Sequence, residues 1–247
     1  MKIHLKTSSM WLDKLYINAL ELITEGYYRR QERQIKAPSL LKQLNEFTLI
    51  AEIKPASPSE GSFSNLTRDR IEEIFSEASA LSVLTEPTYF EGSLENLYHA
   101  CSYGKPVLMK DIIIHESQIQ EYCSAILLIY KLLDEERIHE LIKYAHSKGV
   151  EVLLEVDNEA DFSKAHELPA DILGVNNRNL DTMQIDTSMA ERILVESTTD
   201  KPVVALSGYS SREEIQAVQE NGASGVVIGS VLSRSKNPSL KLRELTP

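Results

Sequence analysis

Eight short, almost continuously apolar runs are spaced along the chain, and nearly all of them end in polar or charged residues. Runs of this kind are typical of strands buried on both faces of a parallel sheet. They are Leu49–Lys54, Leu81–Glu86, Pro106–Asp111, Ala125–Ile129, Glu151–Val156, Ile172–Asn177, Pro202–Gly208 and Gly225–Ser230. The pattern therefore predicts eight strands.

Amphipathic stretches that are typical of helices lie between these runs. Examples are 67–80, 116–122, 134–148, 159–168 and 211–221. Asp134 and either Ser210 or Ser211 are placed to cap the starts of two helices, and Gly149 and Gly222 follow the ends of two. Eightfold β–α alternation predicts an α/β fold, the (β/α)8 TIM barrel, with a doubly wound open sheet as the alternative.

About 46 residues precede the first strand and contain two further helical stretches, 10–33 and 39–46. No Pro/Gly/Ser-rich linker separates them from the barrel, so we expect one domain over 1–247, with a helical extension (1–46) and a barrel (47–247). The extension could plug the N-terminal end of the barrel or cover its active-site face.

Composition narrows the classes of function. With 42% hydrophobic and 26% charged residues, the 247-residue chain has the composition of a globular protein. A net charge of −11 argues against a nucleic-acid partner, although a barrel can still concentrate a few cations around a small anion. The six histidines show no metal-ligand spacing, so no metal is expected.

Location is predicted from the cysteines and from the lack of long apolar stretches. Cys101 and Cys123 form no C-x-x-C pair and are expected to be buried thiols, which fits a reducing compartment. No apolar stretch is long enough to span a membrane, and the first residues lack the apolar core of a signal peptide. We therefore expect a cytoplasmic protein without membrane contact.

Polar residues at the ends of the predicted strands indicate a catalytic site, because the active sites of (β/α)8 enzymes lie at the C-terminal ends of the strands. Glu52 and Lys54 are two positions apart and so point to the same face, as do Asn176 and Arg178. For Glu52 and Lys54, an internal salt bridge that caps the core is the alternative. Further strand-end residues are Glu86, Lys110, Asp111, Glu155 and Ser207.

Small residues end the last two strands. Ser207-Gly208 and Gly229-Ser230 would let a phosphate approach backbone N–H groups, and a short helix expected from about Ser230 would add its positive end. Either pair alone is common turn chemistry. Together, on the two strands where barrels often bind phosphate, they predict a phosphate site.

Seven blocks of sequence resemble one family. The segment AEIKPASPSEG (51–61) is similar to the signature of indole-3-glycerol-phosphate synthases, with Glu-x-Lys at the end of strand one followed by Ser-Pro-Ser and Gly. The resemblance continues in order through 84–97, 106–114, 153–156, 174–180, 207–209 and 227–232. The N-terminal extension is also similar to the helical segment of that family.

The resemblance implies an activity: a 1-(2-carboxyphenylamino)-1-deoxyribulose 5-phosphate substrate closes its ring and loses CO2 and water, in tryptophan biosynthesis. Lys110 matches the acid that protonates the developing oxyanion, whereas Glu52, Lys54 and Glu155 match residues for dehydration whose individual steps stay open. Asn176 and Ser207 complete the implied catalytic set. No cofactor is implied.

The resemblance also implies how the substrate is bound. Arg178 would meet the substrate carboxylate or orient a neighbouring acid. The phosphate would contact Lys54, Ser57, Gly208, Gly229 and Ser230. The aromatic ring would lie in an apolar slot near Phe90, Ile112 and Leu180.

Three positions depart from the family pattern. Leu206 stands where a Glu is common, Ile112 where a Phe is common, and Pro55 where a basic residue is common. We expect the seventh strand to bend at its end, with Leu206 near the solvated mouth and against the substrate ring or a loop.

Two other functions remain as alternatives. One is another phosphate-binding barrel enzyme such as a phosphoribosyl isomerase, which usually depends on a different acid–base pair. The other is a non-catalytic barrel that binds a sugar phosphate, which the presence of Lys110 and Glu155 argues against. In each case the partner is a small phosphorylated molecule, and we expect a monomer or a weak homodimer.

Overall fold

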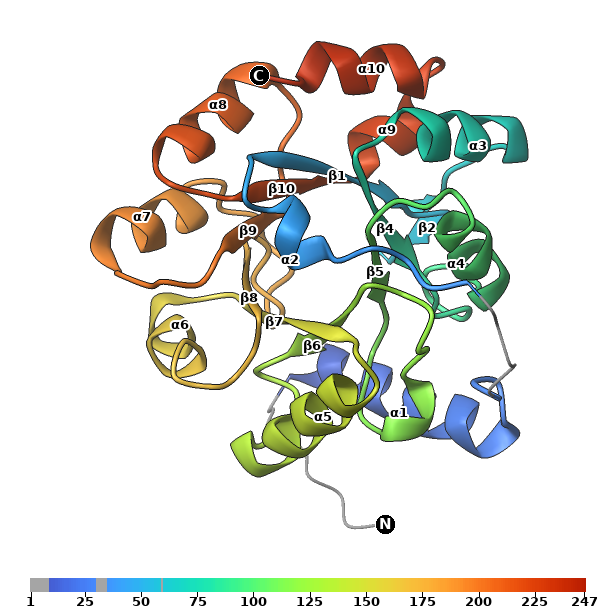
Figure 1. Cartoon of the computed structure of the whole chain (residues 1–247), viewed down its shortest axis with the longest axis vertical. Helices are drawn as coiled ribbons and strands as arrows, with labels where there is room; N and C mark the ends of the chain where they lie inside the picture. Colours follow the sequence, from blue (N-terminus) through green and yellow to red (C-terminus); the bar gives the residue numbers. More distant parts are fainter. Residues whose placement is uncertain (1–8, 30–34, 59) are drawn as a thin grey trace.

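The predicted strands close into a parallel barrel (Figure 1). The computed structural model describes residues 9–29, 35–58 and 60–247. Neighbouring strands follow the order β1-β10-β9-β8-β7-β6-β5-β4, and β4 pairs with β1 to close the ring. Their bounds are β1 Thr48–Ile53, β4 Ala80–Leu84, β5 Val107–Lys110, β6 Ala125–Ile129, β7 Glu151–Val156, β8 Ile172–Asn176, β9 Val203–Leu206 and β10 Gly225–Ile228. The (β/α)8 prediction is confirmed, and the open-sheet alternative is wrong.

Helices surround the barrel (Figure 1). They are α3 Arg68–Glu77, α4 Leu94–Cys101, α5 Glu135–Ser147, α6 Glu159–Ala165, α7 Met189–Glu196, α8 Arg212–Glu220, α9 Ser230–Arg234 and α10 Pro238–Leu245. The predicted cap at Asp134 is confirmed, because it accepts from the N–H of Arg137 at 2.8 Å. Of the two candidates for the other cap, Ser210 and Ser211, it is Ser211 that forms a capping box with Glu214. Gly149 and Gly222 have φ of 67° and 101°, the left-handed conformation that ends a helix.

The predicted helix 116–122 is wrong. Only a 3-10 turn, η1 Glu116–Gln118, forms there. The Gln118 side chain explains this, because it donates to the carbonyl of Ile112 and accepts from the backbone N–H groups of Ile114 and His115. Side-chain bonds of this kind compete with helix hydrogen bonds for the backbone.

The N-terminal extension contacts the two ends of the barrel. Helix α1 (Met10–Glu25) stops at Gly26, whose φ of 76° ends it, so the predicted helix 10–33 is too long, and its last four residues lie outside the described part of the chain. Asn18 on this helix donates to Glu86 at 2.8 Å, and Tyr28 donates to Asp111 at 3.0 Å, so α1 lies over the C-terminal ends of the strands. The second predicted helix is also shorter than expected, α2 Leu40–Gln43.

Helix α2 lies at the opposite end of the barrel. Glu151, the first residue of β7, accepts from the N–H groups of Leu40 and Leu41 at 2.9 and 3.0 Å. Figure 1 shows α2 across the centre of the ring of strands. Both alternatives are therefore realised: α2 plugs the N-terminal end of the barrel, and α1 covers the face where the strands end.

A hairpin follows β1 at the mouth of the barrel. Its two strands, β2 Ala56–Ser57 and β3 Gly61–Ser62, pair in antiparallel fashion.

Both predicted thiols, Cys101 and Cys123, are buried and free. None of the described helices combines the length and apolar composition needed to cross a membrane.

Candidate active site

Two lysines flank one buried carboxylate at the mouth of the barrel. Glu52 ends the inward-facing row of β1, and its Oε2 atom accepts from Lys110 Nζ of β5 at 2.7 Å. Lys54 Nζ lies 3.6 Å from the other oxygen, Oε1. The alternation of the strand thus places Glu52 and Lys54 together, as the sequence predicts.

Burial and charge set the protonation states of this cluster. Burial by itself would raise the pKa of Glu52, but the ammonium groups of Lys110 and Lys54 outweigh it and lower that pKa. Burial would lower the pKa of Lys110, but Glu52 and Glu155 outweigh it and raise it. Burial prevails at Lys54 and lowers its pKa. Glu52 is therefore held ionised and Lys110 held protonated, whereas Lys54 releases its proton more readily than an ordinary lysine.

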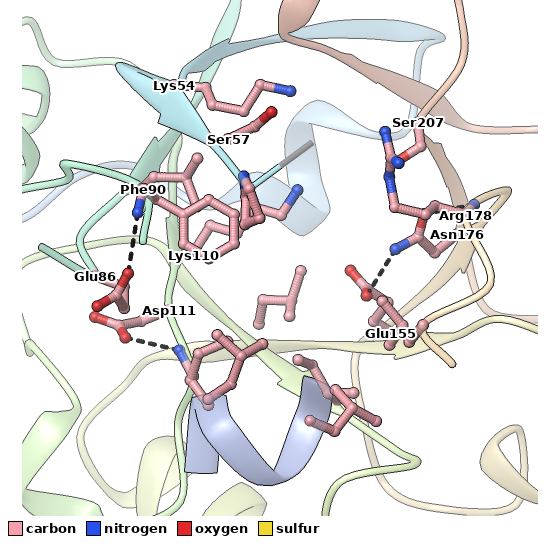
Figure 2. A pocket seen from close by; sticks show the side chains of 18 of the residues that line it. Lys54, Ser57, Glu86, Phe90, Lys110, Asp111, Glu155, Asn176, Arg178 and Ser207 are labelled. Carbon is pink, nitrogen blue, oxygen red and sulfur yellow. Dashed lines mark hydrogen bonds between the residues drawn. The ribbon is translucent and has the colours of Figure 1, made fainter. Parts of the chain in front are cut away.

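A second carboxylate faces the same space from β7. Glu155 Oε1 accepts from Asn176 Nδ2 of β8 at 2.9 Å (Figure 2). Its other oxygen, Oε2, is buried and has no hydrogen-bond partner among the described residues. Burial raises the pKa of Glu155 despite the nearby Lys110. Asn176 Oδ1 in turn accepts from the N–H of Arg178 at 2.9 Å, so β7 and β8 form one network.

The first of two adjoining hollows at the mouth is largely apolar. Its empty volume is about 840 Å³, including space that is open to solvent, and it brings the three predicted slot residues Phe90, Ile112 and Leu180 together. Figure 2 shows Phe90 facing Glu155 and Asn176 across this space. Helix α1 also contributes Trp11, Leu12 and Leu15 to this hollow, which sequence reasoning missed. They precede the first barrel strand by more than 30 residues, and no motif marks them.

The second hollow is polar and contains the small residues that end the last two strands. Gly208, Gly229 and Ser230 line it together with Lys54, whose Nζ donates to Ser230 Oγ at 2.7 Å. The expected short helix, α9, begins at Ser230. Ser57 lies in the first hollow instead, and its hydroxyl bonds to Glu60 at 3.3 Å. We call Lys54, Gly208, Gly229 and Ser230 the candidate phosphate residues.

Five residues line both hollows, so the two meet at a charged junction. They are Glu52, Lys54, Lys110, Arg178 and Ser207. Ser207 has a φ of 67° and Gly208 a φ of 93°, so the chain turns sharply just after β9. The guanidinium of Arg178 is held by the carbonyl of Met183 at 3.0 Å.

Gly229 has a role that sequence reasoning missed. A Cβ atom added there would lie 2.3 Å from Glu52 Oε1 and 3.1 Å from Cδ. Real Cβ atoms essentially never approach another heavy atom below 3.0 Å. The absence of a side chain at Gly229 therefore leaves room for the central carboxylate, besides any benefit to a phosphate.

The expected position of Leu206 is wrong, although the expected bend is present. Leu206 has 0% exposed surface and lines neither hollow. It pairs with Asn176 of β8 and so faces the barrel interior, where a Cβ on Gly174 would lie 3.0 Å from its Cδ1. Because Gly174 has no side chain, Leu206 fills the gap beneath the mouth instead of reaching solvent.

Two buried acids near the site tie loops and the extension together. Glu86 accepts from the N–H groups of Tyr89 and Phe90, at 2.7 and 3.1 Å, and so positions Phe90. Asp111 accepts from the hydroxyls of Thr85 and Tyr28 and from the N–H of Ile112, and burial raises its pKa to about 6.

Across the described ranges, no group of three or more His, Cys, Asp or Glu is arranged to hold a metal ion.

Comparison with known proteins identifies the family. A family model described as indole-3-glycerol phosphate synthase matches residues 12–245. A curated relative of that name from Nautilia profundicola is 36% identical over 216 residues, 85% of this chain and 84% of the relative. One from Bacillus cereus strain G9842 is 35% identical over 240 residues, 92% of this chain and 94% of the relative.

Solved structures agree on the fold alone. A 3-hexulose-6-phosphate synthase from Salmonella typhimurium aligns with a TM-score of 0.64 at 14% identity, covering 81% of this chain and 96% of that one. A thiamine phosphate pyrophosphorylase from Pyrococcus furiosus aligns with a TM-score of 0.60 at 14% identity, covering 82% and 95%. The family match spans the barrel, the junction residues and most of the extension. The chain belongs to the indole-3-glycerol phosphate synthase family.

Proposed function

We propose that the charged junction carries out the reaction of this family on 1-(2-carboxyphenylamino)-1-deoxyribulose 5-phosphate, giving indole-3-glycerol phosphate, CO2 and water. The observation that supports this most directly is the position of the Lys110–Glu52 pair, 2.7 Å apart where an apolar hollow meets a polar one. The family match favours this activity over a phosphoribosyl isomerase or a non-catalytic barrel.

The substrate has two unlike ends, and each fits one hollow. Its aromatic ring suits the apolar slot of Phe90, Ile112 and Leu180, and its phosphate suits the candidate phosphate residues. The C2′ carbonyl lies between these ends and would therefore lie at the junction. Arg178 lines both hollows and is available for the substrate carboxylate.

Lys110 is the proposed acid for ring closure. As the aromatic carbon attacks C2′, the carbonyl oxygen takes up negative charge and needs a proton. Lys110 is kept protonated by Glu52 and Glu155 and faces the junction. Glu52 has both oxygens next to ammonium groups and a lowered pKa, so its proposed role is to hold the two lysines in place.

Two further residues are suited to the later steps. Once the ring has closed, the iminium-like intermediate accepts the electrons released with CO2. Dehydration then needs an acid for the departing C2′ hydroxyl and a base for a proton. Lys54 has a lowered pKa and is the proposed acid; Glu155 has an oxygen without a hydrogen-bond partner among the described residues and is the proposed base. Asn176 orients Glu155, and Ser207 contributes to the junction wall.

The test is direct conversion of the carboxyphenylamino substrate, followed by the fluorescence of the indole product. We expect turnover that obeys saturation kinetics and that is competitively inhibited by inorganic phosphate. A protein that binds phosphate but forms no indole product would support the non-catalytic alternative. Isomerisation of a phosphoribosyl substrate without indole formation would support the isomerase alternative.

The remaining expectations are also proposals. Contacts of Asn18 and Tyr28 with strand-end acids, and of Glu151 with α2, support a single folding unit over 1–247. A monomer or weak homodimer in the cytoplasm is proposed from the sequence, with free buried thiols in support. The reaction as written requires no cofactor.

A further inference from the structure

An acidic side chain of the protein itself lies among the candidate phosphate residues. Glu60 stands between β2 and β3, and its Oε2 atom accepts from Ser230 Oγ at 2.7 Å. Lys54 Nζ donates to the same Ser230 oxygen at 2.7 Å. The other carboxylate oxygen, Oε1, forms an ion pair with Arg234 of α9. Glu60 thus lines the second hollow with a negative charge.

We propose that the Glu60 carboxylate is an internal competitor that occupies the position of the substrate phosphate and sets the affinity for it. This rests on the proposed function, because it takes the second hollow as the phosphate end of the site. A carboxylate and a phosphate use the same donors, namely hydroxyl, ammonium and guanidinium groups. Glu60 engages a hydroxyl and a guanidinium, and the ammonium of Lys54 lies one hydrogen bond further on.

The two anions cannot share this position. A phosphate that accepts from Ser230 and Lys54 displaces the Glu60 carboxylate, because both need the Ser230 hydroxyl and their charges repel. Displacement also releases Arg234, which then faces the incoming phosphate. Only molecules in which Glu60 has left the hollow can bind phosphate, so the apparent dissociation constant is the intrinsic one divided by the fraction of such molecules. Removing the carboxylate should therefore tighten phosphate binding.

The competing explanation is that Glu60 only anchors the hairpin to α9 through Arg234. Its side chain is 19% exposed, and Ser57 Oγ also bonds to it at 3.3 Å, which fits either view. The two differ in sign. An anchor, when removed, loosens the hollow and weakens phosphate binding or leaves it unchanged, whereas a competitor, when removed, strengthens it.

The experiment compares wild type with Glu60→Gln and Glu60→Ala, and uses Glu72→Gln as the control. Glu72 lies on α3 and pairs with the exposed Arg68, so its substitution removes the same charge at a position away from the mouth. Inorganic phosphate is titrated while the fluorescence of Trp11, the only tryptophan, is followed, and KM and kcat are measured with the substrate. A second ligand, N-(2-carboxyphenyl)glycine, carries the aromatic half without phosphate.

We expect both Glu60 variants to bind inorganic phosphate about tenfold more tightly and to lower KM similarly, with kcat within about twofold of wild type. Glu72→Gln and the binding of N-(2-carboxyphenyl)glycine should not change. Unchanged or weaker phosphate binding in Glu60→Gln, or equal tightening of the phosphate-free ligand, would overturn the proposal. Tighter phosphate binding without indole formation by any variant would support it while rejecting the proposed function.

Discussion

Replacing Gly229 by Ala should disable the central carboxylate without occupying the phosphate position. The new Cβ would lie 2.3 Å from Glu52 Oε1, and an ordinary contact is 3.4 Å or more, so the carboxylate has to retreat by about 1 Å. That movement disturbs the 2.7 Å bond to Lys110 and the 3.6 Å contact with Lys54. Misplacement of a catalytic group by about 1 Å can cost about 10²-fold in rate.

The expected result for Gly229→Ala is therefore a fall in kcat of about 10²-fold with KM changed less than about threefold. Its neighbour provides the contrast. Ser230→Ala removes a hydroxyl from the polar hollow but leaves Glu52 untouched, so KM should rise and kcat should stay close to wild type. Steady-state kinetics by indole fluorescence measure both, and thermal melts verify that each variant is folded.

A double mutant tests the cause. In a Glu52→Ala background the contacts with Oε1 and Cδ no longer exist and only the 3.2 Å approach to the Cβ of residue 52 is left, so Gly229→Ala should lower kcat little further. Additive losses would show that Gly229 acts through something other than Glu52. A raised KM with normal kcat in Gly229→Ala would instead show that the glycine serves the phosphate and would refute the steric argument.

Three further predictions concern single groups. Lys110→Ala should lower kcat by about 10²–10⁴-fold, the usual contribution of general acid–base catalysis, and melts should show a folded protein. Glu155→Gln should remove the acidic limb of the kcat/KM profile; in wild type this limb should lie above the 4.5 of an ordinary Glu because burial raises the pKa. The free energy of unfolding of Asp111→Asn, measured in urea, should rise relative to that of wild type as pH increases from 4 to 8, by about 3 kcal/mol at most.

The sign for Asp111 follows from its raised pKa. Burial favours the protonated form, so its contribution is complete below the ordinary value of 3.8 and is lost as pH rises through about 6. Asparagine mimics the protonated acid and keeps acceptors for Tyr28 and Ile112. A constant difference between the two proteins from pH 4 to 8 would contradict this. Normal turnover in Lys110→Ala, or an unchanged acidic limb in Glu155→Gln, would remove that residue from the mechanism.

The sequence by itself determined the barrel and the polar side chains at its mouth. Strands buried on both faces produce apolar runs that can be read directly, and all eight runs formed strands. Alternation along a strand is equally local, so the shared direction of Glu52 and Lys54, and of Asn176 and Arg178, followed from spacing alone. Lys110 and Glu155 were found in the same way, as charges that end apolar runs.

Only the tertiary structure decided how distant segments complete the site. Trp11 reaches the apolar hollow, Glu60 reaches Ser230, and the missing side chain of Gly229 leaves room for Glu52. Leu206 is buried for a similar reason, because Gly174 on the next strand leaves a gap that it fills. Each of these depends on atoms far apart in the chain, and no periodic pattern encodes such contacts. Packing around the closed barrel brings them together, which is why they appear only once the chain is folded.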